Sequence, residues 1–104
     1  MTTASSYITN TGANVLTSSG NTVLTWMSVT NYTAGDATAN IHVMRSGGLA
    51  SNVNMIVANV LITAGDTFQL YVGNEKLVLE NGTSVYAIAN ISNALSTVLS
   101  YTAA

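Results

Sequence analysis

The sequence contains very little charge. Six of its 104 residues are charged, or 6%, against roughly 25% in a typical soluble domain. Asn, Ser and Thr take their place and together supply 38 residues. Two basic residues and a formal net charge of −2 argue against a nucleic-acid partner, because contacts to a phosphate backbone need several Lys or Arg side chains.

Cysteine and proline are absent, and histidine occurs once, at position 42. The lack of cysteine excludes a disulfide framework, a thiolate metal site and a thiol nucleophile. We interpret His42 as a surface or interface residue in the middle of a strand. No acidic residue lies near it in the sequence to orient it as a catalytic base.

The acidic residues are too scattered for an acid–base pair or a calcium loop. Asp36 and Asp66 each end a Thr-Ala-Gly-Asp sequence, and we interpret the two copies as similar turns that Asp stabilises. A metal shared by two distant loops stays open as an alternative. We predict that the protein is not an enzyme and has no catalytic, cofactor-binding or metal-binding residue and no cofactor.

Long apolar runs are also missing. The longest, from Met55 to Ile62, has eight residues and includes Asn59, which is too short to span a bilayer as a helix. The first residues show no basic region followed by an apolar one, so no signal peptide is predicted. Frequent Val, Ile, Leu and Tyr together with low charge indicate a folded chain, and its length fits one domain. We expect no membrane partner.

Turns containing Gly or Asn-Gly divide the chain at intervals of about 8 to 16 residues. The segments between them are rich in Val, Ile, Thr, Tyr and Leu. They are 22–33, 37–45, 53–62, 67–72, 76–80, 84–91 and 95–101. This pattern predicts an all-β fold, an antiparallel β-sandwich of jelly-roll or immunoglobulin-like type with seven or eight strands. The nearly continuous apolar segment 53–62 is expected to be a central strand or one covered on both faces.

Alternation within these segments predicts which side chains face the core. In 37–45, Ala39, Ile41 and Val43 are expected on one face. The other face is expected to carry Asn40, His42 and Met44. The predicted core consists of Met27, Val29, Ile41, Val43, Val60, Ile62, Phe68, Leu70, Leu77, Leu79, Val85 and Ala87.

Residues 1–20 differ in composition from the rest. They are rich in Thr, Ser and Asn, with small apolar islands at Tyr7-Ile8 and Val15-Leu16. We interpret residues 1–20 as an N-terminal arm or an edge hairpin, and residues 21–104 as the β-sandwich domain. We expect the arm to contact another chain, because an extended segment can add a strand to an exposed sheet edge.

The aromatic residues allow two interpretations. They are core and interface residues, or some of them form a platform on which a sugar ring stacks. The candidates for such a platform are Trp26, Tyr32, Tyr71, Tyr86 and Tyr101.

Residues 22–101 resemble a known group of proteins. The run TVLTWMSVTNY at 22–32 is followed by ATANIHV at 37–43 and later by VLITAGDTFQL at 60–70. A strand ending in Asn that leads through a turn to a second strand, and a later Gly-Asp-Thr-Phe turn before an alternating strand, resemble small β-sandwich structural proteins of tailed bacteriophages, particularly marine and cyanobacterial phages.

This resemblance implies a virion structural protein made in the bacterial cytoplasm, which the absence of cysteine suits. It would decorate or cement the capsid, or attach at the neck or tail. The implied partners are other copies of the chain and a larger capsid or tail protein. A trimer is expected by analogy with docking at threefold positions on capsids. The alternative is a receptor- or glycan-binding module at a fibre or tail tip.

Overall fold

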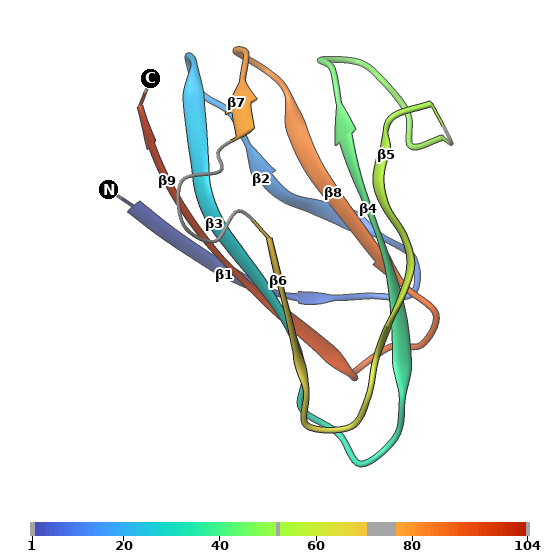
Figure 1. Ribbon diagram of the computed structural model, residues 1–104. Coiled ribbons are helices and arrows are strands. Elements are labelled where there is room, and N and C mark those ends of the chain that lie inside the picture. Colours follow the sequence, from blue (N-terminus) through green and yellow to red (C-terminus); the bar gives the residue numbers. More distant parts are fainter. Residues whose placement is uncertain (1, 52, 71–76, 104) are drawn as a thin grey trace.

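The computed structural model describes residues 2–51, 53–70 and 77–103. All regular secondary structure in these residues is β-strand, which confirms the predicted fold class (Figure 1). No helix in this part of the chain is long and apolar enough to cross a membrane. The strands are β1 (Thr2–Ile8), β2 (Ala13–Thr17), β3 (Thr22–Asn31), β4 (Ala37–Met44), β5 (Met55–Ile62), β6 (Thr67–Leu70), β7 (Leu77–Leu79), β8 (Ser84–Ala89) and β9 (Leu95–Ala103).

These strands form two antiparallel sheets that pack face to face as a β-sandwich (Figure 1). Sheet A has the order β1-β9-β3-β6, and β7 also pairs with β3, on the side that β6 occupies. Sheet B has the order β2-β8-β4-β5. The described residues thus contain nine strands where seven or eight were expected. The predicted strands 67–72 and 76–80 extend into 71–76, outside the described residues.

The segment 1–20 supplies one edge strand to each sheet. β1 pairs with β9 from Thr2↔Tyr101 to Ile8↔Leu95, and β2 pairs with β8. Between them the chain crosses from sheet A to sheet B through Gly12, whose φ of 82° suits glycine. The two strands therefore lie in different sheets of the same sandwich, and the expected contact with another chain stays a prediction.

The core lies between the two sheets. Seven of the twelve predicted core residues are buried, and the other five are half-buried against the same cluster. Burial of each large aliphatic side chain contributes about 1.5–3 kcal/mol. The core also contains residues that the prediction did not include, namely Ile8, Leu16, Leu24, Ala37, Ala39, Ala89, Ala94, Leu95 and Leu99.

The apolar strand β5 is not central, so that prediction was wrong. Among the described strands, β5 is the outermost one of sheet B and pairs with β4 alone. Its outward side chains include Ile56, 40% exposed, and Leu61, 59% exposed. An apolar run shows that a strand can be covered on both faces, but the described part of this chain covers the face of β5 that is turned to the core and leaves Ile56 and Leu61 on the other face exposed.

His42 lies on the outer side of sheet B, as the alternation predicted, but it is not a surface residue. It is buried because the described loop residues 45–51 and 53–54 fold back against it. Its Nδ1 lies 3.0 Å from the Ser51 carbonyl oxygen and 2.8 Å from Asn54 Oδ1. The Tyr86 ring meets the imidazole edge-on at 5.7 Å. The expectation of a surface histidine was therefore wrong, and a contact of this residue with another chain stays a prediction.

The two Thr-Ala-Gly-Asp turns lie side by side at one end of the sandwich, joined by Asn31. This side chain is fully buried, and its Nδ2 donates to the carbonyl oxygens of Gly35, at 2.7 Å, and Ile62, at 2.9 Å. Asp36 Oδ1 accepts a hydrogen bond from the Ala64 backbone N at 3.2 Å, and Asp66 accepts one from the Thr63 hydroxyl. Both aspartates stabilise turns, as predicted.

Candidate functional site

The outer face of sheet A, the side turned away from sheet B, consists largely of hydroxyl side chains. Residues paired across antiparallel strands point to the same side of a sheet, so the register arranges these side chains in rows. One row is Tyr7, Ser96, Thr30 and Thr67; the next is Ser5, Val98, Ser28 and Gln69. Neither row contains a charged residue.

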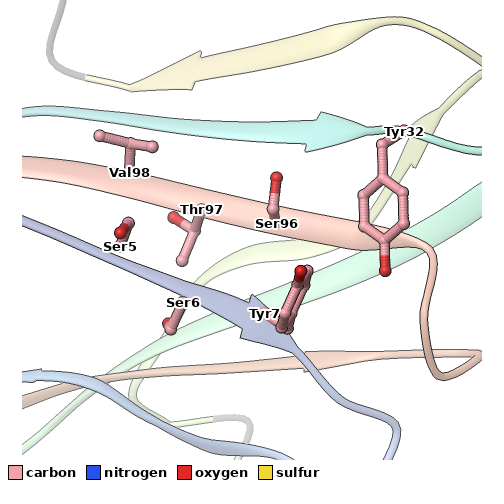
Figure 2. Close-up of a pocket in the computed structure, with 7 residues that line it drawn as sticks. All are labelled: Ser5, Ser6, Tyr7, Tyr32, Ser96, Thr97 and Val98. Carbon is pink, nitrogen blue, oxygen red and sulfur yellow. The ribbon is translucent and has the colours of Figure 1, made fainter.

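An open depression of about 500 Å³ lies at one end of this face, beside Tyr7 of β1 and Tyr32, the residue after β3. Ser96 of β9 lies beside the two tyrosines (Figure 2). Tyr7 is 68% exposed and Tyr32 is 49% exposed. Their ring centroids are 5.9 Å apart and the ring planes are inclined by 57°. The other lining residues are Ser5, Ser6, Thr97 and Val98.

Local structure holds both tyrosines at the surface. Ile8 is buried in the core, and neighbouring side chains on a strand point to opposite faces, so Tyr7 points outward. The Tyr32 backbone N donates to the Ala94 carbonyl oxygen at 3.1 Å, which ties the end of β3 to the turn before β9. The site offers aromatic faces and hydroxyl groups without charge. This chemistry suits a neutral ligand that carries both C–H and O–H groups.

The predicted aromatic candidates do not gather at one place. Tyr32 lies at the depression, and Tyr71 lies outside the described residues. Trp26 lies on the outer face of sheet A, further along β3. Tyr86 lies on sheet B, and Tyr101 is half-buried against the core. Tyr7 was not predicted as a member, because it approaches Tyr32 only through the placement of β9 between β1 and β3.

A second surface lies along the 46–65 segment, which contains β5 and the loop before it. This stretch of sequence has no charged residue between Arg45 and Asp66. Four large apolar side chains are exposed on it: Leu49 at 84%, Val53 at 97%, Ile56 at 40% and Leu61 at 59%. Exposed large apolar side chains are common at protein–protein contact sites.

The described residues bring together few groups of the kind that catalysis needs. His42 faces an amide and a backbone carbonyl rather than a carboxylate. Among the described residues, no group of three or more His, Asp or Glu side chains is placed to hold a metal ion. Arg45 and Glu80 line a hollow of about 410 Å³ with Ser46, Gly47, Gly48, Asn81 and Thr83. That hollow has charges of both signs but no base paired with a nucleophile.

No family model, curated protein or solved structure matches the chain. Its function is therefore inferred from the Tyr7/Tyr32 depression, the 46–65 surface and the edges of the sheets. The resemblance of residues 22–101 to phage structural proteins stays a prediction.

Proposed function

We propose that the chain is a non-enzymatic structural protein of a bacteriophage virion. It decorates or cements the capsid, or attaches at the neck or tail, through contacts with other copies of itself and with a larger shell or tail protein. The observation that supports this most is the uncharged 46–65 surface with its four exposed apolar side chains. A surface of this kind favours association, because burying apolar area is favourable and no charge opposes it.

The phage assignment rests on the resemblance of residues 22–101 and on the β-sandwich architecture that it implied. Density-gradient purification of virus particles from cultures that make the protein, followed by quantitative mass spectrometry, tests it. The chain should band with the particles at a constant ratio to the main shell protein. Recovery only in the soluble fraction would contradict the proposal.

Substitution within the 46–65 surface tests its role. Val53→Asp should lower the copy number per particle, because an unpaired carboxylate at a contact must be desolvated. Val78→Asp is the matched control, since Val78 is also exposed, at 65%, but lies on β7 of the other sheet. Equal incorporation of the two variants would remove the 46–65 surface from the proposal.

Self-association should depend little on salt. With so few charges on the chain, changing NaCl from about 0.05 to about 0.5 M has little to screen, and a strongly excluded salt such as ammonium sulfate should strengthen association. Sedimentation of the purified protein across a salt series measures this. An oligomer that dissociates over that NaCl range would instead show that ion pairs, for example of Arg45 with Asp36 or Glu80, hold it together.

The second candidate function is glycan binding, and the Tyr7/Tyr32 depression favours it. Two exposed tyrosine rings beside serine hydroxyls can stack against the C–H face of a sugar and hydrogen-bond its hydroxyl groups. The absence of charge among the lining residues indicates a neutral sugar. Such a site would make the chain a receptor-binding module at a fibre or tail tip.

Calorimetric titration with a panel of neutral oligosaccharides tests this candidate. Tyr32→Ala should weaken binding by roughly tenfold, the loss expected when one ring contact is removed. Tyr86→Phe is the control, because Tyr86 lies on sheet B, away from the depression. If no member of the panel binds, or if both variants weaken binding equally, the depression is not a sugar site.

A further inference from the structure

The edges of the two sheets differ in how they are protected against pairing with another strand. Natural proteins block open edges with short strands, bulges, charged side chains or proline. β2 has a register shift between Asn14 and Leu16. β5 is irregular opposite Ile41, and its Asn59 has a φ of 49°. Each of these edges therefore has at least one protective feature.

β1 has none of these features. It has seven residues in unbroken register with β9. Its sequence, TTASSYI, contains no charge and no proline. It is the first strand in the order of sheet A, so within residues 2–51, 53–70 and 77–103 no strand lies beside the backbone N–H and C=O groups on its other side. An edge of this kind is a template for a further strand.

β1 is also held weakly by its own chain. Ile8 is its one buried side chain, whereas Thr2, Thr3, Ser5, Ser6 and Tyr7 are exposed. Ala4 and Ser6 point to the same side as Ile8, yet neither is buried, so the inner side of β1 is largely uncovered. Ordering a strand costs backbone entropy, and β1 offsets this with little apolar burial. A second row of backbone hydrogen bonds would stabilise it.

We propose that β1 pairs with β1 of a second copy of this chain, antiparallel and with Ser5 opposite Ser5, so that sheet A continues across a twofold axis. This inference rests on the proposed function, because it names the partner and the surface for self-association. It predicts a dimer where the resemblance to phage proteins implied a trimer.

Two constraints select this register. The outer-face residues of one copy must lie opposite outer-face residues of the other. Because side chains alternate between the two faces along a strand, two paired residues must both have odd numbers or both have even numbers, so their numbers add to an even sum. The same parity also pairs residues whose backbone groups both point away from β9, since that direction alternates along a strand. An even sum of ten is the one that lets all seven residues of β1 pair. It places Thr3 opposite Tyr7 and Ala4 opposite Ser6.

A second copy fits this edge because the strand is complementary to itself. The pairing needs no charge complementarity, because neither strand contains a charged residue. Thr3 and Ser5 are small, exposed and close to the axis, so two copies can approach without a steric barrier. Tyr7 would then cover the Thr3 side chain of the neighbouring copy, an aromatic–β-branched pair of the kind that stabilises sheets.

Charge substitution on one row of sheet A tests the pairing. Ser5→Lys places two like charges directly opposite each other at the axis, and should raise the dimer dissociation constant by roughly tenfold or more. Gln69→Lys is the matched control, because Gln69 lies in the same cross-strand row and on the same face, but at the opposite edge of sheet A. Sedimentation velocity over a concentration series measures both variants, and circular dichroism confirms that each is folded.

The expected result is a dimeric parent chain, a weakened Ser5→Lys dimer and an unchanged Gln69→Lys dimer. Equal weakening by both lysines overturns the proposal, as does a trimer insensitive to Ser5→Lys. A parent chain that stays monomeric also overturns it and leaves the β1 edge to a strand of another protein. The proposed function fails separately, because it is decided by whether the chain bands with particles.

Single cysteines test the register. The chain has no cysteine of its own. In the proposed dimer the two position-5 Cα atoms lie about 4.5–5.5 Å apart, within the range that a disulfide bridges. The two position-3 Cα atoms are separated by about four residue steps along the strands, roughly 13 Å, which is too far. Ser5→Cys should therefore form a disulfide-linked dimer much faster than Thr3→Cys on mild oxidation. Equal rates overturn the proposal.

Discussion

Part of the outer face of sheet B is covered, because the loop residues around Ser51 and Asn54 fold back against β4 and bury His42. Both of its edge strands, β2 and β5, have irregular register. Sheet A leaves its outer face open, with rows of hydroxyl side chains, and its edge strand β1 runs without irregularity. The two sheets share one core, but sheet B carries structural features that limit strand addition and sheet A carries fewer of them.

The two sheets differ in how the polar groups at their surfaces are satisfied. Where the chain folds over itself, polar groups such as the His42 imidazole are satisfied internally, and no described buried side-chain N or O atom lacks a hydrogen-bond partner. Along β1, no other described strand pairs with the outward backbone groups, which are open to solvent and to an added strand. Stability measurements can establish how far the two sheets are independent.

The largest effects are expected in the shared core. Leu99 in sheet A and Ile41 in sheet B are both fully buried at the centres of their sheets. Leu99→Ala and Ile41→Ala should each lower the free energy of unfolding by about 2–5 kcal/mol. Both variants should unfold in one transition in urea, followed by Trp26 fluorescence and by circular dichroism. Two separate transitions would show that the sheets are independent units.

The next largest loss of stability is expected from substitution at Gly12, where the chain crosses from sheet A to sheet B. Gly12 has φ +82°, and an added Cβ would overlap the Tyr86 side chain. Gly12→Ala should lower the free energy of unfolding by about 2–3 kcal/mol, because it combines backbone strain with displacement of the tyrosine. Gly20→Ala is the control, since Gly20 has φ +71° with open space around it. Equal losses in the two variants would mean that strain alone acts at Gly12.

A smaller effect is expected where the loop 45–54 covers sheet B. His42→Ala removes the side chain that faces Ser51 and Asn54, and should cost about 1–2 kcal/mol. The Val43 amide, which donates to the Asn54 carbonyl oxygen at 2.9 Å, should exchange hydrogen faster. Ser96→Ala on the open face of sheet A should leave stability and exchange unchanged. Unchanged exchange at Val43 in the histidine variant would show that the loop is held without His42.

The smallest effect is expected on the exposed side of β5. Leu61→Thr should change the free energy of unfolding by less than about 0.5 kcal/mol, because the side chain is 59% exposed. Thermal unfolding at low protein concentration, where chains do not associate, measures this. A larger loss would mean that Leu61 packs against part of its own chain.

The sequence predicted those features that depend on local pattern. Alternation and turn spacing located the strands from β3 to β9, and side chains such as Met27, Val29 and Val85 were correctly placed in the core. Composition was less informative for 1–20, since Thr and Ser occur in strands and in loops alike. The β1 and β2 strands form there because β9 and β8 offer partners far away in the chain, from Ile8↔Leu95 to Thr2↔Tyr101 for β1 and from Thr17↔Ser84 to Ala13↔Ala87 for β2.

Features set by long-range neighbours were not predictable. Whether an apolar segment such as β5 lies at the centre or the edge of a sheet depends on strand order, which alternation does not encode. His42 was assigned to the correct side of its strand, but its burial depends on how the loop 45–54 folds. The pairing of Tyr7 with Tyr32 likewise depends on which strands lie on either side of β9.

The position of β9 has a consequence for the order in which the chain folds during synthesis. The four strands of sheet B are complete once Ala89 has been made, but sheet A cannot close until β9 enters between β1 and β3. Pairings so distant in sequence form slowly, on roughly millisecond to second times. Each new chain therefore passes through an interval in which β1 has been made but β9, the strand it pairs with, has not. At high ribosome loading, the β9 strand of a neighbouring chain competes for the place between β1 and β3. Slower expression at lower temperature should therefore favour chains that pair with their own β9 over strand-exchanged ones.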